Sequence, residues 1–257
     1  MKRQIALDTE TTGLRPEDGH KIVEIGAVEL INGVKTGKTF NTLINPRRLI
    51  PDEVIKIHGI TNERVKNAPV FHDIADEFIA FIKNSELLIH NADFDIKFLN
   101  SELAYADKGK IWDHVLNAVC TLKLSKKLYK TREDFKITDI GTSGTGQKRV
   151  SYKLDSLCEL LNIDNSHRVL HGALLDADLL SDIYMAIRKM HPLEDIESDM
   201  EQTNWVRPPI KRVGGLRFTK AVLSKDELEE HEMFLKHLEA DFKVLPIFKL
   251  EVKKYKP

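Results

Sequence analysis

The stretch IALDTETTG, from Ile5 to Gly13, decides how this chain is interpreted. With the residues before it, it begins as a nearly continuous apolar run, which is typical of a buried β-strand. Asp8 and Glu10 then stand two residues apart, and residues at that spacing in a strand point to the same face. Such close like charges raise each other's pKa unless a cation lies between them. Mg²⁺ and Mn²⁺ prefer carboxylate oxygens, so the pair predicts a metal site, and two solvated acids at a frayed strand end are the alternative.

The composition is that of an ordinary globular protein. The chain has 257 residues, 42% hydrophobic and 31% charged, with a formal net charge of −1. This balance does not favour wrapping a long nucleic acid, but it allows a small nucleic-acid site neutralised by metal ions. Cys120 and Cys158 lack partners at metal-ligand spacing, so we expect reduced, buried thiols in a cytoplasmic protein. We expect neither a signal peptide nor a membrane span, since no run approaches the roughly 20 apolar residues that a span needs.

The order of the predicted elements indicates an α/β fold, with a mixed sheet flanked by helices. The alternating segment KIVEIGAVELING ends at Asn32-Gly33, a strong hairpin signal, and KTFNTLINP follows as the returning strand. Strands and helices alternate after this hairpin. We expect a strand at 85–91, a strand feeding a helix at 116–124, and helices at 70–82, 93–103, 153–163 and 171–190.

Two segments interrupt this pattern. The polar, glycine-rich segment Thr131–Ser151 is expected to be a loop. After Met190, an acidic run, paired prolines and paired glycines mark a linker. We therefore expect a catalytic domain at residues 1–190, a linker at 191–215 and a C-terminal segment at 216–257.

Two further acids are predicted to face the core of the protein. Asp95 shares a helical face with apolar residues, whereas Asp93 lies nearer the helix start, where capping and the helix dipole favour an acid. Asp176 shares the apolar face of the last long helix, and Asp178 is turned roughly 200° away from it. An inward acid is costly without a partner, so Asp95 and Asp176 are candidate metal ligands.

His171 precedes the last helix, in the pattern H-x-x-x-x-D that ends at Asp176. A single histidine at such a position is more often structural or exposed. Beside an inward acid, however, an imidazole with a pKa of about 6.5 can take a proton from water near neutral pH. His171 is therefore the candidate general base.

Taken together and in order, these motifs resemble the DEDD-type 3′–5′ exonucleases of the histidine subclass, in particular the epsilon-type proofreading subunits of bacterial replicative DNA polymerases. The resemblance rests on LDTETTG, KIVEIGAVE, IHGIT, IHNADFDIKF and NIDNSHRVLHGALLDA, and it covers about Arg3 to Arg188. It implies an RNase H-like fold and two divalent cations, Mg²⁺ or Mn²⁺, with His171 as general base. The implied metal ligands are Asp8, Glu10, Asp95 and Asp176. We expect metal, rather than salt bridges, to compensate the inward charges of Asp95 and Asp176.

The resemblance also implies contacts to a substrate, the 3′ end of single-stranded or frayed DNA. In this family an acid and a histidine before the GIT motif hold the terminal nucleotide, and here they are Glu53 and His58. The turn Thr9–Gly13 should run beside the sugar and base. The expected substrate-binding residues are Asp8, Thr9, Glu10, Thr11, Glu53, His58 and Asp176. The segment Thr131–Ser151 is longer than the family pattern, and nothing in the sequence gives it a function.

The C-terminal segment has the pattern of a partner-binding helix. A capping box, S-x-x-E, opens it at Ser224, and apolar residues follow at helical spacing as far as Phe242. The resemblance implies that this helix binds the polymerase (alpha) subunit, and it allows a small accessory subunit; packing against its own domain is the alternative. Gln202–Val206 (QTNWV) faintly resembles a sliding-clamp motif, and a tryptophan buried against the domain is an equal alternative.

The favoured function is a proofreading exonuclease that removes mispaired 3′-terminal nucleotides from DNA by two-metal-ion hydrolysis. An RNA-trimming exonuclease is the second enzymatic interpretation, and the linker with its C-terminal helix argues against it, because a free-standing trimmer needs no tether. A catalytically silent scaffold in a polymerase assembly is the alternative from another class. The complete set of acids with His171 argues against that alternative.

Overall fold

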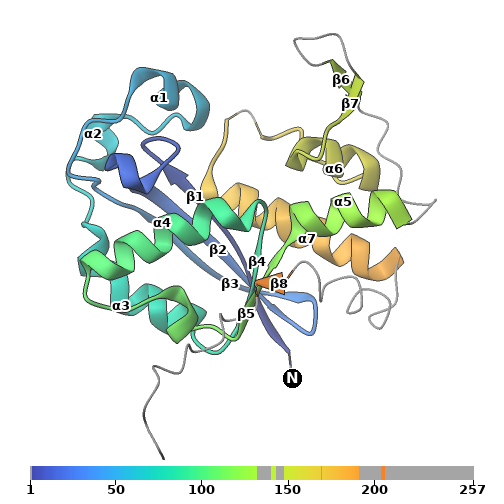
Figure 1. The fold of residues 1–257 in the computed structure, drawn as a ribbon, viewed down its shortest axis with the longest axis horizontal. Coiled ribbons are helices and arrows are strands. Elements are labelled where there is room, and N and C mark those ends of the chain that lie inside the picture. Colours follow the sequence, from blue (N-terminus) through green and yellow to red (C-terminus); the bar gives the residue numbers. More distant parts are fainter. Residues whose placement is uncertain (1, 132–139, 143–147, 169, 191–203, 206–257) are drawn as a thin grey trace, which may run out of the picture. The chain divides into compact units, whose positions relative to one another are not determined.

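The computed structural model describes residues 2–131, 140–142, 148–168, 170–190 and 204–205 (Figure 1). Across these residues, six strands form one mixed sheet in the order β3-β2-β1-β4-β5-β8, and β6 and β7 form a separate two-stranded ribbon. The strands are β1 (Arg3–Thr11), β2 (Ile22–Ile31), β3 (Val34–Leu43), β4 (Glu86–Ile89), β5 (Asn117–Cys120), β6 (Ile140–Thr142), β7 (Lys148–Val150) and β8 (Asn204–Trp205). The α-helices are α1 (Asp52–His58), α2 (Asn62–Val65), α3 (Phe71–Ile82), α4 (Ala92–Tyr105), α5 (Thr121–Thr131), α6 (Leu154–Leu161) and α7 (Ala173–Met190).

The first three strands form the antiparallel half of the sheet. β2 and β3 meet at Asn32 and Gly33, whose φ angles of 50° and 78° are the positive values that a tight hairpin turn requires. β1 pairs with β2 on one side and runs parallel to β4 on the other, and β4 in turn runs parallel to β5. The mixed α/β sheet predicted from the sequence is confirmed.

Alternate side chains of β1 enter two different hydrophobic cores. Ile5 and Leu7 belong to the core that contains α3 and α4, whereas Ala6 belongs to the core that contains α6 and α7. The helices α4 and α7 accordingly lie on opposite faces of the sheet (Figure 1). Because strand residues alternate between faces, the even-numbered residues at the end of β1 point toward α7 and the odd-numbered ones toward α4.

The predicted helices are confirmed, and each buries its apolar stripe. The segment predicted at 70–82 is α3, and its predicted apolar positions are all buried: Phe71, Ile74, Ala75, Phe78 and Ile82. The segments at 93–103, 153–163 and 171–190 are α4, α6 and α7, with ends shifted by a few residues. These stripes cover both faces of the sheet, as amphipathic helices do.

Two segments differ from the expectation of irregular chain. The predicted loop Thr131–Ser151 contains the ribbon of β6 and β7, in which Ile140 pairs with Val150. The predicted linker at 191–215 contains β8, which pairs with Ala118 and Val119 of β5 at the edge of the sheet. Edge strands present unpaired backbone groups, which explains how so short a segment can join the sheet. The C-terminal segment at 216–257 lies outside the described residues.

Two smaller expectations concern the cysteines and the membrane. Cys120 and Cys158 are both free and buried, as predicted. Among the helices that the structure describes, none has the length and apolar character needed to cross a membrane.

Candidate active site

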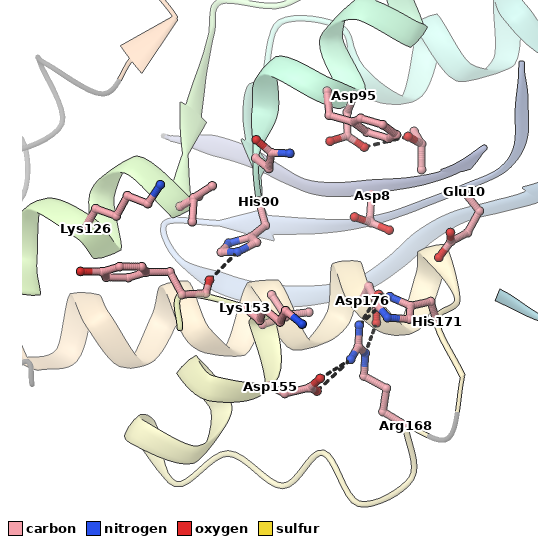
Figure 2. Close-up of a pocket in the computed structure, with 16 residues that line it drawn as sticks. Asp8, Glu10, His90, Asp95, Lys126, Lys153, Asp155, Arg168, His171 and Asp176 are labelled. Carbon is pink, nitrogen blue, oxygen red and sulfur yellow. Dashed lines mark hydrogen bonds and ion pairs between the residues drawn. The ribbon is translucent and has the colours of Figure 1, made fainter. Parts of the chain in front are cut away.

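The first two acids of the site lie within β1. The strand continues to Thr11, so Asp8 and Glu10 are paired with β2 on their backbone and do not form a frayed end. Glu10 is nearly buried, and both side chains face the start of α7, as Figure 2 shows. The alternative of two solvated acids at a strand end is therefore wrong.

Asp95 enters the same site from the opposite face of the sheet. It lies in the first turn of α4 and is buried, as predicted from its position on the apolar face. The hydroxyl of Thr9 donates a 2.7 Å hydrogen bond to Asp95 Oδ1. Asp93, in contrast, is partly exposed and pairs with Lys123 at 3.2 Å, as expected of a surface acid near the helix start.

Asp176 lies in the first turn of α7 and is also buried. Arg168 binds it with two hydrogen bonds, from Nε to Oδ1 at 2.6 Å and from Nη2 to Oδ2 at 2.9 Å. The structure therefore gives Asp176 a salt-bridge partner that the sequence analysis did not expect, and metal binding by Asp176 stays a prediction. An arginine fork matches a carboxylate geometrically, and an inward acid takes such a partner when one is within reach. Asp178, on the other side of the helix, pairs with Lys35 at 2.6 Å.

The loop before α7 carries His171 to the edge of the site. Its side chain is 49% exposed, and Nδ1 lies 3.2 Å from Asp176 Oδ2. The backbone at the start of α7 is fixed from β2, because Glu24 Oε2 accepts a 2.9 Å hydrogen bond from the N–H of Ala173. Gly26 permits this approach, since a Cβ there would lie 2.0 Å from the backbone nitrogen of Leu174.

The four predicted acids and His171 line one open cavity of about 600 Å³. Figure 2 shows the acids and His171 toward one end and Lys126 toward the other. Lys153 and the aromatic side chains of Phe94 and Tyr152 also line the cavity. His90 is another lining residue and joins two segments, with Nδ1 3.0 Å from the hydroxyl of Thr121 and Nε2 2.9 Å from the backbone oxygen of Tyr152.

The acids carry more negative charge than the protein around them compensates. Burial, reinforced by the charges of neighbouring acids, raises the pKa of Asp8 well above its ordinary range and that of Glu10 to about 8. Burial raises the pKa of Asp95 to about 7, although the hydrogen bond from Thr9 opposes it. Burial acts on Asp176 too, but its contacts with Arg168 and, after it, with His171 outweigh burial, so the pKa of Asp176 is lowered.

The donor atoms suit a hard divalent cation. One ligand atom each from Glu10, His171 and Asp176 lies within 4.8 Å of the others, and Asp8 and Asp95 add carboxylate oxygens to the same cavity. Mg²⁺ and Mn²⁺ prefer such oxygens, and a bound cation removes the repulsion that raises the pKa values of these acids. The residues present therefore fit the metal that the sequence predicts.

The predicted substrate residues are distributed unevenly. Thr9 lines the cavity, whereas Thr11, Glu53 and His58 are not among its lining residues. The hydroxyl of Thr11 donates to the backbone oxygen of Gly13 at 2.6 Å, and Glu53 is exposed on α1. His58 is buried, which lowers its pKa, and its Nδ1 accepts a hydrogen bond from the backbone N–H of Ile60.

Several residues of the site were not predicted from the sequence. They are Arg168, Asp155, His90, Lys126 and Lys153. Exposed lysines carry no signal in the sequence pattern, and neither does an arginine three residues before His171. Only the fold shows that these residues line the same cavity as the acids.

Comparison with known proteins agrees with the geometry. Residues 5–184 match the Exonuclease (RNase_T) family model. The chain is 40% identical over 236 residues to "DNA polymerase III subunit epsilon" of Rickettsia felis, covering 91% of this chain and 95% of the relative. It is 40% identical over 247 residues to the protein of that name from Buchnera aphidicola subsp. Schizaphis graminum, covering 92% and 97%.

Solved structures support the fold. The nuclease domain of 3′hExo, a DEDDh family member bound to rAMP, matches with a TM-score of 0.58 at 22% identity, covering 74% of this chain and 92% of that one. E. coli Exonuclease I in complex with a dA16 oligonucleotide matches with a TM-score of 0.63 at 14% identity, covering 77% and 42%. At these identities the likeness shows the RNase H-like exonuclease fold alone. The extent of the family match and of the 40% identity shows that the chain belongs to the exonuclease family and, within it, to the DNA polymerase III epsilon subunits.

Proposed function

We propose that this chain is the proofreading 3′–5′ exonuclease of a replicative DNA polymerase and hydrolyses mispaired 3′-terminal nucleotides. One observation carries the proposal. Four acids and one histidine, from β1, α4 and the start of α7, line the same cavity although they are far apart in the sequence. The 40% identity to epsilon subunits over most of the chain supports the same conclusion.

The proposed roles follow from the chemistry of each group. Asp8, Glu10, Asp95 and Asp176 would hold two divalent cations, Mg²⁺ or Mn²⁺, through carboxylate oxygens. When bound, such ions supply the positive charge that lowers the pKa of a coordinated water and stabilises the leaving 3′ oxygen. His171 is half exposed beside Asp176, so its ring can take a proton from water that enters from solvent.

The opposite wall of the cavity suits the rest of a nucleotide strand. Lys126 and Lys153 offer ammonium groups to phosphates, and Phe94 and Tyr152 offer aromatic rings to bases. A pocket with anionic and cationic walls fits a substrate whose phosphate must reach the acids through bound cations. A net charge of −1 is therefore compatible with a nucleic-acid substrate.

Glu53 and His58 are proposed to hold the terminal nucleotide, although they stand outside the cavity described above. Their helix, α1, is joined to the catalytic loop, because the N–H of His171 donates a 3.2 Å hydrogen bond to the backbone oxygen of Ile57. A nucleotide that extends past Glu10 toward α1 would reach both residues. Thr9 and Thr11, at the end of β1, would lie beside its sugar and base.

The test is hydrolysis by the full chain of three 3′-labelled substrates: single-stranded DNA, duplex DNA with a mispaired 3′ end, and RNA of the same sequence. We expect hydrolysis with Mg²⁺ or Mn²⁺ and none with EDTA, and faster release from mispaired than from paired ends. Asp176→Asn should abolish hydrolysis, while the matched control Asp178→Asn, on the same helix but facing Lys35, should retain it.

The results separate the proposed function from its alternatives. Equal or faster hydrolysis of RNA would favour an RNA-trimming enzyme. Complete inactivity with every substrate and metal would favour a silent scaffold. Full activity of Asp176→Asn would contradict the assignment of the metal ligands.

We further propose that the C-terminal segment, residues 216–257, binds the polymerase (alpha) subunit through an amphipathic helix at 224–242. A chain that ends after Pro209, the last residue of the first compact unit, should remain an active nuclease on short single strands. It should no longer co-elute with the polymerase subunit, and neither should the full chain with Leu235→Asp and Leu238→Asp. Undiminished co-elution of the shortened chain would move the interface onto the catalytic domain.

Contacts with a sliding clamp and with a small accessory subunit are separate proposals. For Gln202–Val206 to bind a clamp, Asn204 and Trp205 would have to leave their pairing with β5. We therefore expect a synthetic peptide that spans Gln202–Val206, in which this pairing cannot form, to bind the clamp more tightly than the full chain does. The measurement is the affinity of the clamp for the peptide and for the full chain, and equal affinities would contradict the expectation.

A further inference from the structure

Arg168 contacts three other side chains that line the cavity. Besides its two hydrogen bonds to Asp176, its Nη1 donates to both oxygens of Asp155, at 2.8 and 2.7 Å, and its Nη2 lies 2.8 Å from His171 Nδ1 (Figure 2). The side chain of Arg168 is only 7% exposed. It therefore joins an acid proposed as a metal ligand, the proposed general base and an acid outside the metal set.

The two carboxylates hold the guanidinium in different ways. Asp176 is buried, so its charge needs a partner in the absence of metal, and Arg168 occupies both of its oxygens. Asp155 is half exposed, at 53%, and binds the other side of the guanidinium. If Arg168 released Asp176, its bonds to Asp155 would still keep the guanidinium at the edge of the site.

Arg168 and Asp176 compete for the same nitrogen of His171. A guanidinium has donors only, so Nδ1 of His171 must accept from Arg168. The same Nδ1 lies 3.2 Å from Asp176 Oδ2, a contact that would need a proton on Nδ1. A nitrogen of a neutral imidazole cannot do both, so the position of Arg168 decides what the ring of His171 binds.

We propose that Arg168 is the resident counter-cation of the metal site, anchored by Asp155, and that it competes with the divalent cation for Asp176. In the metal-free protein it holds Asp176 and His171 in position; when Asp176 binds metal, the guanidinium retains Asp155 and releases Asp176. Arg168 is in this sense a positioning residue. The inference rests on the proposed function, in which Asp176 is a metal ligand.

The test compares Mn²⁺ affinity and melting temperature in wild type, Arg168→Gln and Arg168→Lys, using the full chain. In EDTA, Arg168→Gln should melt below wild type, because Asp176 loses its partner. With saturating Mn²⁺ the difference should shrink, and the dissociation constant for Mn²⁺ should fall roughly tenfold or more, since a charge-assisted competitor is gone. Arg168→Lys keeps the charge but loses the planar fork, so its Mn²⁺ affinity should lie between the other two.

Arg3→Gln is the matched control. Arg3 also binds a buried acid, Glu29, at 2.6 Å, but on a part of the sheet away from the cavity. Its loss should lower the melting temperature equally with and without Mn²⁺. If Arg168→Gln behaves like this control and binds Mn²⁺ with wild-type affinity, Arg168 is a structural residue and the inference is overturned.

Two further measurements keep the outcomes distinct. The ¹⁵N chemical shifts of the His171 ring in the metal-free protein should change in Arg168→Gln, because Nδ1 loses its donor; unchanged shifts would contradict the proposal. Asp176→Asn should lose Mn²⁺ binding. If Asp176→Asn still binds Mn²⁺, the proposed metal site is wrong. If Asp176→Asn loses Mn²⁺ binding but Arg168→Gln binds Mn²⁺ with wild-type affinity, only the proposed role of Arg168 is wrong. Should Arg168→Gln not fold, Arg168→Lys carries the same comparison, and wild-type Mn²⁺ affinity in it would overturn the inference.

Discussion

The substitution Glu10→Gln should stabilise the metal-free protein, and more so at high pH. Burial raises the pKa of Glu10 from 4.5 to about 8, and the charges of Asp176, Glu24 and Asp95 act in the same direction. Between these two pH values the folded protein binds a proton that the unfolded chain releases. Folding stability is therefore lost as the pH rises through this window, and glutamine, which does not ionise, avoids that loss.

The magnitude follows from the two pKa values. The difference between 4.5 and about 8 corresponds to at most roughly 5 kcal/mol at pH 8, and to at most about 1.4 kcal/mol at pH 5.5. Relaxation of the metal-free site and entry of water reduce such values, so we expect about 2–3 kcal/mol at pH 8. For a protein of this size that stabilisation corresponds to an increase in melting temperature of roughly 5–10 °C.

The assay is thermal unfolding in EDTA at pH 5.5 and pH 8, followed by circular dichroism, for wild type, Glu10→Gln and the exposed-acid control Glu77→Gln. The gain should be several times larger at pH 8 for Glu10→Gln and absent for Glu77→Gln. With Mn²⁺ the order should reverse, because the variant lacks a carboxylate that we propose as a metal ligand. A gain that is equal at both pH values, or no gain at all, would refute the argument from burial and repulsion.

Three other predictions use the same site. His171→Ala should lower the rate of DNA hydrolysis by roughly 10²–10⁴-fold while Mn²⁺ binding is largely retained, and near-normal turnover would make the histidine structural. The double substitution Lys126→Ala with Lys153→Ala should raise KM for single-stranded DNA with little change in kcat. The control Lys130→Ala, on the same helix as Lys126, should change neither. A wild-type KM in the double variant would exclude Lys126 and Lys153 from the substrate path. Gly26→Ala should destabilise the fold by roughly 1–3 kcal/mol in urea unfolding, because its Cβ would lie 2.0 Å from the backbone of α7, and wild-type stability would show that α7 can shift at no cost.

The sequence was sufficient for the elements whose patterns are local. The turn at Asn32-Gly33 and the apolar stripe of α3 depend on residues close together in the chain, and both were predicted correctly. The inward direction of Asp95 and Asp176 followed from helical periodicity and is confirmed by their burial. The resemblance then supplied the fold and the family.

Features that depend on distant partners were not predicted. β8 consists of two residues that become a strand only because the edge of β5 is available to pair with them. Arg168 compensates Asp176 through a loop geometry that periodicity does not encode, so metal was expected in its place. The hydrogen bond from Thr9 to Asp95 forms on the face of the sheet that α4 covers, and it needs the end of β1 to lie beside the first turn of α4.

The order in which the acids occur along the chain has a consequence for synthesis. Asp8, Glu10 and Asp95 leave the ribosome early, but Asp176 and His171 belong to the last described helix and the loop before it. A nascent chain that has emerged only as far as β5 therefore contains most of the acidic cluster without the group that completes it. Because α7 must pack against β1 and β2 over a large sequence separation, we expect this docking to be among the slow steps of folding. The nuclease would thus be inert throughout most of its own translation and would become active only when the domain closes.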